Sequence, residues 1–334
     1  MAHAVPFREE LPPGYEWFED EVEFDPRLHL QLEPPAEVIT LADLGYSAED
    51  VADLPTPVAT SAPFRILSEE GAGVMLDVAR RLRTEARSCE RIQNMTRGGV
   101  FQSRWLRDLC LDESLTELMS EIYGTAVAPH PMPSHLGHLN YEPDEIDVAV
   151  DKWHHDTLPL DFVMAVSDLA ATSGGEFEYF HGTKQEATDL AASGRVPPRD
   201  RVVSAACPPG VAVALHGNMV VHRGAPLHEP AERITMVNGY VALDTSVPDQ
   251  SRTADLIEID DPAFLYTDWA RHAAWRAAGR LQTLVEQLPY GVDGTEAAGH
   301  LRLAIADVES AIADIEAGAP SRIHHYEHGD PRAS

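Results

Sequence analysis

The sequence has few of the features that mark secreted, membrane-spanning or disulfide-framed proteins. Only three cysteines, Cys89, Cys110 and Cys207, occur among 334 residues, and none belongs to a C-x-x-C pair. This spacing argues against a disulfide framework or a thiolate zinc site and leads us to expect a reducing, cytoplasmic location. No segment approaches the roughly 20 consecutive apolar residues of a membrane span. The N-terminus has no basic region followed by an apolar one, so we expect no signal peptide.

Basic residues are also scarce. The chain has 25 Lys and Arg against 55 Asp and Glu, a formal net charge of -30, and only Lys152 and Lys184 are lysines. Nucleic acids and anionic membranes attract basic patches, so we expect neither as a partner. Hydrophobic residues make up 44% of the chain and charged residues 24%, as in ordinary globular proteins. A small-molecule substrate remains compatible with this charge.

Composition divides the chain into three parts. Residues 1–63 are rich in Pro and acidic residues with scattered aromatics, which predicts an extended arm packed on the body at a few aromatic points. Residues 64–250 are predicted to form a helical lead-in followed by a β-rich domain, which contains the candidate catalytic residues described below. Residues 251–334 are predicted to form a helical segment that packs on this domain.

The β-rich part runs from about residue 134 to 243. Its short runs are separated by turn signals such as Gly174-Gly175 and Pro208-Pro209-Gly210. The runs are SHLGHLNY, DFVMAVSD, EFEYFH, RVVSAA, VAVALH and RITMVNGYVAL. Only one helical insertion, near 184–193, interrupts them. Strands that follow one another without crossover helices predict an antiparallel sandwich or barrel.

Helical periodicity appears on both sides of this region. Residues 67–92 are predicted to form a helix capped by Ser68, and residues 111–123 a helix that ends at Gly124. Two further helices are predicted over 263–288 and 295–317. In the last helix, apolar residues follow a 4-3-4-3 spacing: Leu301, Ile305, Val308, Ile312 and Ile315. This stripe is interpreted as a core face packed on the barrel, with a homodimer seam as the alternative.

The segment Trp153-His154-His155-Asp156-Thr157 is the most informative motif. In an extended strand, residues i and i+2 share a face, so His154 and Asp156 converge while His155 points away. A third ligand must come from elsewhere, and His222 follows the apolar run Met219-Val220-Val221; His216 is the competing candidate. Two imidazoles and one carboxylate form a facial triad that suits non-heme Fe(II).

The next β-rich run supplies a candidate anion site. Arg233 and Thr235 share a face, and a guanidinium pairs bidentately with a carboxylate. A buried arginine requires an anion, from either a ligand or a protein carboxylate. His138 and Asn140 share a face of an earlier strand. They are candidates for contact with a cosubstrate or substrate; the alternative is that they only line the wall of the barrel, with their hydrogen bonds satisfied by the protein. The arginines expected at the substrate entrance or in surface salt bridges are Arg97, Arg104, Arg107 and Arg223.

Over residues 65–245 the sequence resembles the iron(II)- and 2-oxoglutarate-dependent dioxygenases, and more narrowly the phytanoyl-CoA dioxygenase-like branch. The matching pieces are ELMSEIYG, WHHDT, SGGEFEYFHGTK, PGVAVALHGNMVVHRGAP and ERITMVNGY. The resemblance implies a double-stranded β-helix, a jelly-roll, cupin-like core that is mainly β with flanking helices. It implies Fe(II) on His154, Asp156 and His222. It also implies 2-oxoglutarate clamped by Arg233 beside Thr235, and O2 at the last open position.

The implied activity is an oxygenase that most simply hydroxylates a small metabolite and releases succinate and CO2. Because Asp156 is present where the related halogenases have a small residue, hydroxylation is favoured over halogenation. Desaturation and ring closure use the same ligands and stay open. Two other interpretations stay open as well: a zinc-dependent isomerase or hydrolase on a cupin-like barrel, and a binding module without catalysis.

Overall fold

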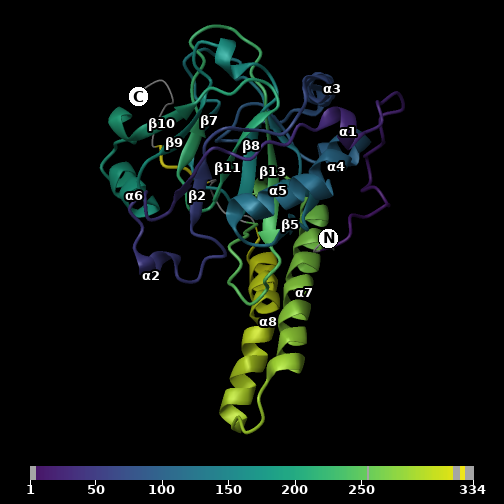
Figure 1. Cartoon of the computed structure of the whole chain (residues 1–334), viewed down its shortest axis with the longest axis vertical. Helices are drawn as coiled ribbons and strands as arrows, with labels where there is room; N and C mark the ends of the chain where they lie inside the picture. The colour runs from purple at the N-terminus through teal and green to yellow at the C-terminus, as the bar shows by residue number, and fades with distance from the viewer. Residues whose placement is uncertain (1–4, 254–255, 319–323, 328–334) are drawn as a thin grey trace.

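Two antiparallel β-sheets form the centre of the fold in the computed structural model, which describes residues 5–253, 256–318 and 324–327 (Figure 1). The main path of the larger sheet runs through β1 (Val38–Thr40), β2 (Val58–Ser61), β11 (Val211–Leu215), β8 (Leu160–Ala165), β13 (Thr235–Ala242), β6 (His138–Asn140) and β4 (Met95–Thr96). On its flanks, β3 (Phe64–Arg65) pairs with β11 and β5 (Val127–Pro129) pairs with β13. The smaller sheet contains, in order, β10 (Val202–Ala205), β9 (Phe177–Phe180), β12 (His222–Gly224) and β7 (Asp151–His154).

The strand order identifies a jelly roll. Strands β6, β8, β11 and β13 lie together in the larger sheet, in the order β11-β8-β13-β6, while β7, β9, β10 and β12 make up the smaller one. From β6 to β13 the chain therefore passes from one sheet to the other at every connection except that between β9 and β10. Eight strands with this connectivity form the double-sheet jelly roll, or double-stranded β-helix. The predicted fold class is confirmed.

The side chains of β8 alternate between two apolar clusters, one on each face of the larger sheet. Phe162 and Met164 belong to the apolar cluster under the flanking helices, whereas Val163 and Ala165 belong to the cluster between the two sheets. The helices that cover the outer face of the larger sheet are α3 (Glu69–Leu82), α4 (Arg104–Cys110) and α5 (Glu113–Tyr123). Because these helices pack on the outer face, the inner face of the sheet can line a cavity.

The helix boundaries differ in part from the sequence expectation. The Ser68 side chain accepts a hydrogen bond from the Gly71 N–H, and Gly124 ends α5 with a φ of 64°, as predicted. The helix expected over 67–92, however, ends at Leu82 with a short 3-10 turn after it. The reason is a competing pairing: the Arg87 N–H donates to the Met95 carbonyl at 2.8 Å, which draws this segment toward the sheet.

The N-terminal segment follows the body at aromatic contacts. Tyr15 lies 5.3 Å from Phe101 between ring centroids, and Trp17 lies under Arg104 and Arg107. Two one-turn helices, α1 (Pro26–His29) and α2 (Ala48–Val51), interrupt it. β1 and β2 also lie within residues 1–63, so the end of the expected arm extends the larger sheet.

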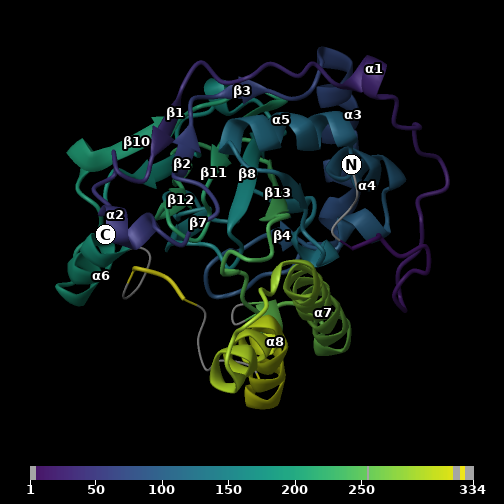
Figure 2. The same cartoon turned by 60° about the horizontal axis from the view of Figure 1, so that its bottom comes forward.

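Two long helices, α7 (Pro262–Gln287) and α8 (Gly294–Ala317), form an antiparallel hairpin that projects from the jelly roll (Figures 1 and 2). The interpretation of the α8 stripe as a core face is wrong, because Leu301, Ile305 and Ile312 are 54%, 39% and 51% exposed. The hairpin instead packs through small residues, with Ala311 against Trp269 and Ala273 of α7. Within the described residues, we find no helix with the length and apolarity to cross a bilayer.

Candidate metal centre

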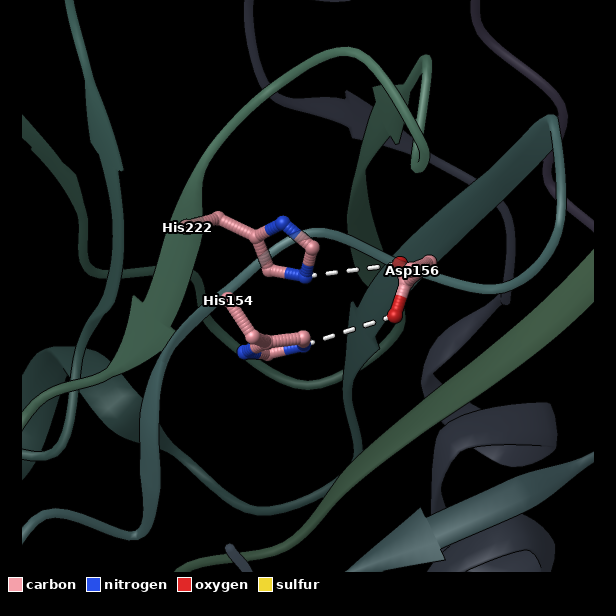
Figure 3. A group of neighbouring side chains, drawn as sticks. All are labelled: His154, Asp156 and His222. Atoms are coloured by element: carbon pink, nitrogen blue, oxygen red, sulfur yellow. Dashed lines mark ion pairs between the residues drawn. The ribbon is translucent and has the colours of Figure 1, made fainter. Parts of the chain in front are cut away.

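Strand pairing in the smaller sheet brings two histidines together. His154 is the last residue of β7 and His222 the first of β12, and these residues are direct partners in the antiparallel register. Their ring centroids lie 4.2 Å apart. Asp156 follows β7, where its N–H donates to the Gly217 carbonyl at 2.8 Å. Figure 3 shows its carboxylate facing both imidazoles.

The donor atoms have the spacing of ligands to one ion. Asp156 Oδ1 lies 3.4 Å from His154 Nε2, and Asp156 Oδ2 lies 3.4 Å from His222 Nε2. All three ligand atoms fall within 4.8 Å of one another. Metal–ligand bonds of roughly 2.1 Å put neighbouring donors of an octahedral ion about 3 Å apart. The three side chains are therefore close enough together to hold one ion, with separations slightly wider than in an ideal octahedron.

The hydrogen bonds of the rings fix which nitrogen faces this point. His154 Nδ1 lies 2.7 Å from the Lys152 carbonyl, and His222 Nδ1 lies 3.0 Å from the Val220 carbonyl. Since a carbonyl only accepts, each Nδ1 carries the proton, and a neutral ring directs the lone pair of Nε2 at Asp156.

The protonation states leave a site that lacks positive charge. Burial, helped by the Arg91 cation, lowers the pKa of His154 to about 3, and burial also lowers the pKa of His222. Burial alone would raise the pKa of Asp156, but His222 and His154 lower it below its usual value when they carry a proton. With both imidazoles neutral, two lone pairs and a carboxylate face one another without a proton between them. Such an arrangement is unfavourable without a cation, so the residues present fit a bound metal ion.

Arg233 provides a buried positive charge in the same cavity. It is 2% exposed; its Nε donates to the Gly175 carbonyl and its Nη1 to Thr235 Oγ1, both at 2.9 Å. No carboxylate among the described residues forms an ion pair with it. Burial lowers the pKa of Arg233 to about 10, a change that the charges of Asp151 and Glu142 partly offset. The guanidinium therefore stays charged at neutral pH and suits an anionic ligand.

β6 places two further candidates beside Arg233. Asn140 and His138 pair with Thr235 and Val237 of β13, and both line the cavity with the metal cluster. Asn140 Oδ1 and His138 Nε2 are buried and have no hydrogen-bond partner among the described residues. Buried polar atoms are normally satisfied, so these two are available to a bound molecule.

The other sequence candidates do not belong to the cluster. His155 Nδ1 lies 2.8 Å from the Tyr326 hydroxyl, and His216 Nδ1 lies 3.1 Å from the Val58 carbonyl. Arg97 and Arg223 line the cavity and pair with Asp260 and Glu178. Arg104 and Arg107 lie over the Trp17 ring, away from the cavity.

Three neighbours of the cluster were not anticipated. Arg91 and Asp151 line the cavity and form an ion pair at 3.0 Å, and burial raises the pKa of Asp151 to about 7. Strict alternation would place Asp151 on the face opposite His154, but β7 and β12 shift register between His222 and Gly224. His135 also lines the cavity, with Nε2 buried and unpaired within the described residues. It is the last residue of a short 3-10 turn, which leaves no periodic signal in the sequence.

A second, larger cavity adjoins the first. Met95, Arg97 and Ile259 line both, so the two share a wall. The outer cavity is also lined by the aromatic residues Tyr15, Phe101 and Phe264, from the N-terminal segment, the turn before α4 and the first turn of α7. It forms a partly apolar space next to the metal cluster.

Comparison with known proteins gives only distant structural likenesses. No protein-family model and no curated protein sequence matches the chain. AviO1 from Streptomyces viridochromogenes Tue57 is 18% identical, with a TM-score of 0.43 over 64% of this chain and 98% of that one. EctD from S. alaskensis with bound Fe is 16% identical, with a TM-score of 0.42 over 70% and 90%.

A third solved structure is the epimerase SnoN in complex with Fe3+, alpha ketoglutarate and nogalamycin RO. It is 17% identical, with a TM-score of 0.40 over 53% of this chain and 76% of that one. The fold assignment rests on the strand order of the chain itself. The narrower resemblance to the phytanoyl-CoA dioxygenase-like branch stays a prediction.

Proposed function

We propose that the protein is a non-heme iron(II)/2-oxoglutarate-dependent oxygenase that hydroxylates a small molecule. One observation carries the proposal: two neutral imidazoles and a carboxylate converge in the same cavity that holds the buried guanidinium of Arg233. The first group suits Fe(II), and the second suits a dicarboxylate that reaches the metal. A jelly roll by itself requires neither.

Each residue has a role in this proposal. His154, Asp156 and His222 would hold the ion, each through one donor atom. Arg233 would bind the distal carboxylate of 2-oxoglutarate through the N–H groups that Gly175 and Thr235 do not occupy. The Thr235 hydroxyl accepts from Arg233 and so has its own proton to donate to that carboxylate.

Asn140 and His138 would contact the keto acid end of 2-oxoglutarate or the substrate through their unpaired buried atoms. When bound, iron(II) and 2-oxoglutarate together activate O2, release succinate and CO2 and oxidise a carbon of the substrate. Asp156 supplies a carboxylate ligand and leaves no place for a halide at that position, which supports hydroxylation rather than halogenation.

The outer cavity is the proposed path of the substrate. It adjoins the metal pocket through Arg97, whose Nη1 lies 3.4 Å from His138 Nδ1 and whose Nη2 is buried without a partner among the described residues. The aromatic wall of Tyr15, Phe101 and Phe264 favours a molecule with an apolar face. Arg97 would then orient an oxygen atom of that molecule.

The proposal is tested by adding Fe(II) and 2-oxoglutarate to the metal-free protein without oxygen. We expect a weak visible charge-transfer band, and on admission of oxygen a slow conversion of 2-oxoglutarate to succinate. His154→Ala should abolish both. The matched control is His155→Ala, which removes the adjacent imidazole that faces Tyr326 and should leave both intact.

The competing interpretation, a zinc-dependent isomerase or hydrolase, predicts a different result. It requires a tightly held Zn²⁺ after purification, with no oxygen uptake in the presence of 2-oxoglutarate. Oxygen consumption in step with succinate formation would exclude it. A protein that binds neither Fe(II) nor 2-oxoglutarate would refute our proposal.

A further inference from the structure

The hairpin of α7 and α8 carries an unusual share of exposed apolar side chains. It comprises about a sixth of the chain, yet it holds eight of the 14 large hydrophobic residues that are exposed within the described part. They are Leu281, Val285, Leu288, Tyr290, Leu301, Leu303, Ile305 and Ile312. All of them except Leu303 and Tyr290 recur at helical spacing along one stripe of each helix, and exposed apolar surface of this kind marks an interaction site.

We propose that this hairpin is the dimer interface, and that its occupant is the hairpin of a second copy of this chain. The apolar residues follow coiled-coil spacing on both helices: Leu281, Val285 and Leu288 on and just after α7, and Leu301, Ile305 and Ile312 on α8. Two hairpins that meet through these stripes form a four-helix bundle. The projection of the hairpin away from the jelly roll leaves room for such a partner (Figures 1 and 2).

The apolar area is a large part of what a stable dimer needs. The exposed fractions of the six side chains in the two stripes add up to about three fully exposed residues. At roughly 100 Å² of apolar area for each fully exposed side chain, they offer on the order of 300 Å². A standard interface buries about 800 Å² on each partner, of which about 65% is apolar in homodimers. The two stripes therefore supply more than half of the apolar part of a dimer interface.

Charge favours a second copy over a membrane. The exposed Glu309 follows Ile305 by four residues and borders the α8 stripe, and an anionic lipid surface would repel it. Arg302 and Glu316 lie near opposite ends of α8 on the same side of its stripe. An antiparallel, two-fold related pair of α8 helices brings Arg302 of each copy toward Glu316 of the other. The surface is thus complementary to itself.

The test is the molar mass of the full chain by sedimentation velocity and light scattering, without added metal. We expect twice the chain mass of 36.6 kDa at micromolar concentration. The double variant Leu301→Glu, Ile305→Glu should raise the dissociation constant of the dimer at least about 100-fold, because it buries four charges in the seam. These side chains are exposed, so the helical circular dichroism should not change.

Val203→Glu is the matched control, because Val203 is an exposed apolar residue on β10, outside the hairpin. It should leave the mass unchanged. A wild-type chain that remains at 36.6 kDa across the concentration range would overturn the proposal. So would a double variant that stays dimeric. Either result leaves the proposed activity untouched, since neither metal nor 2-oxoglutarate takes part in the measurement.

Discussion

Replacement of Arg233 by methionine should separate stability from ligand binding. The guanidinium is buried and is satisfied only in part by the Gly175 carbonyl and the Thr235 hydroxyl. Its pKa falls from 12.5 to about 10 because burial disfavours the charged form. At 1.36 kcal/mol for each pKa unit, the buried charge costs the folded protein about 3 kcal/mol at neutral pH. The cost applies at every pH below the folded pKa, where both states are protonated.

Methionine is apolar and long enough to fill much of the same space. It removes the cost of the charge but leaves the Gly175 carbonyl unpaired, which costs about 1–3 kcal/mol. We therefore expect the ligand-free variant to be at least as stable as wild type, with a gain of up to about 2 kcal/mol. The loss of two charge-assisted hydrogen bonds should weaken 2-oxoglutarate binding by about 3–6 kcal/mol, or roughly 100-fold to 10,000-fold.

Thermal unfolding with Mn²⁺ as a redox-inert metal measures both effects. At a 2-oxoglutarate concentration 100 times its dissociation constant, wild type should gain about 2.7 kcal/mol, and the Arg233→Met variant should gain nothing. Arg223→Met is the control, since Arg223 pairs with Glu178 at 2.7 Å and should be dispensable for the response. The reasoning fails if the Arg233 variant keeps the wild-type response, or if it unfolds several kcal/mol more easily without ligand.

Three further results are expected. Asp156→Ala should lower the affinity for Mn²⁺ at least about 100-fold, as measured by titration calorimetry. An unchanged affinity would show that Asp156 is not a metal ligand. Gly217→Ala should weaken metal binding and stability together, because its Cβ would meet a carboxylate of Asp161 and lie 2.9 Å from Asp156 Oδ2; a variant with wild-type values would contradict this contact. Burial holds the pKa of His155 at about 2 and of His216 at about 4, while unfolded imidazoles titrate near 6.5. Below about pH 6.5 the unfolded chain therefore binds more protons than the folded chain. The free energy of unfolding of the metal-free protein, measured with urea, should fall between pH 7.5 and pH 5 by up to about 1.4 kcal/mol per pH unit for each histidine. A rise on acidification would contradict the assignment.

The jelly roll was predictable because its signals are local. Short β-rich runs separated by Gly and Pro turns leave little room for crossover helices, and they become β6, β8, β9, β10, β11 and β13 in the structure. His154 and Asp156 approach each other as predicted, but β7 ends at His154, and the hydrogen bond from the Asp156 N–H to the Gly217 carbonyl positions the carboxylate. His222 was a candidate because it follows the apolar run 219–221, but its meeting with this pair depends on the pairing of β12 with β7, which no local pattern shows.

What could not be predicted depends on packing between distant segments. A spacing of four and three residues locates an apolar stripe on α8 but does not say what covers it, and Ala304 and Ala311 are the residues that α8 buries. The Arg91–Asp151 ion pair arises from a register irregularity that alternation cannot show. The outer cavity requires the N-terminal segment and α7 to meet, and neither carries a motif for that contact.

The outer cavity has one more consequence, for how this protein can diversify. Tyr15 and Phe264 belong to terminal extensions, whereas the histidines, the aspartate and Arg233 all belong to the barrel. On the proposed function, we expect substitutions in these extensions to alter which molecule is accepted while the metal ligands and Arg233 keep their positions in the barrel. Exchange of the side chains that line the outer cavity is a better route to new specificity than removal of the residues after 250, because the Tyr326 N–H donates to the Trp153 carbonyl on the strand that carries His154.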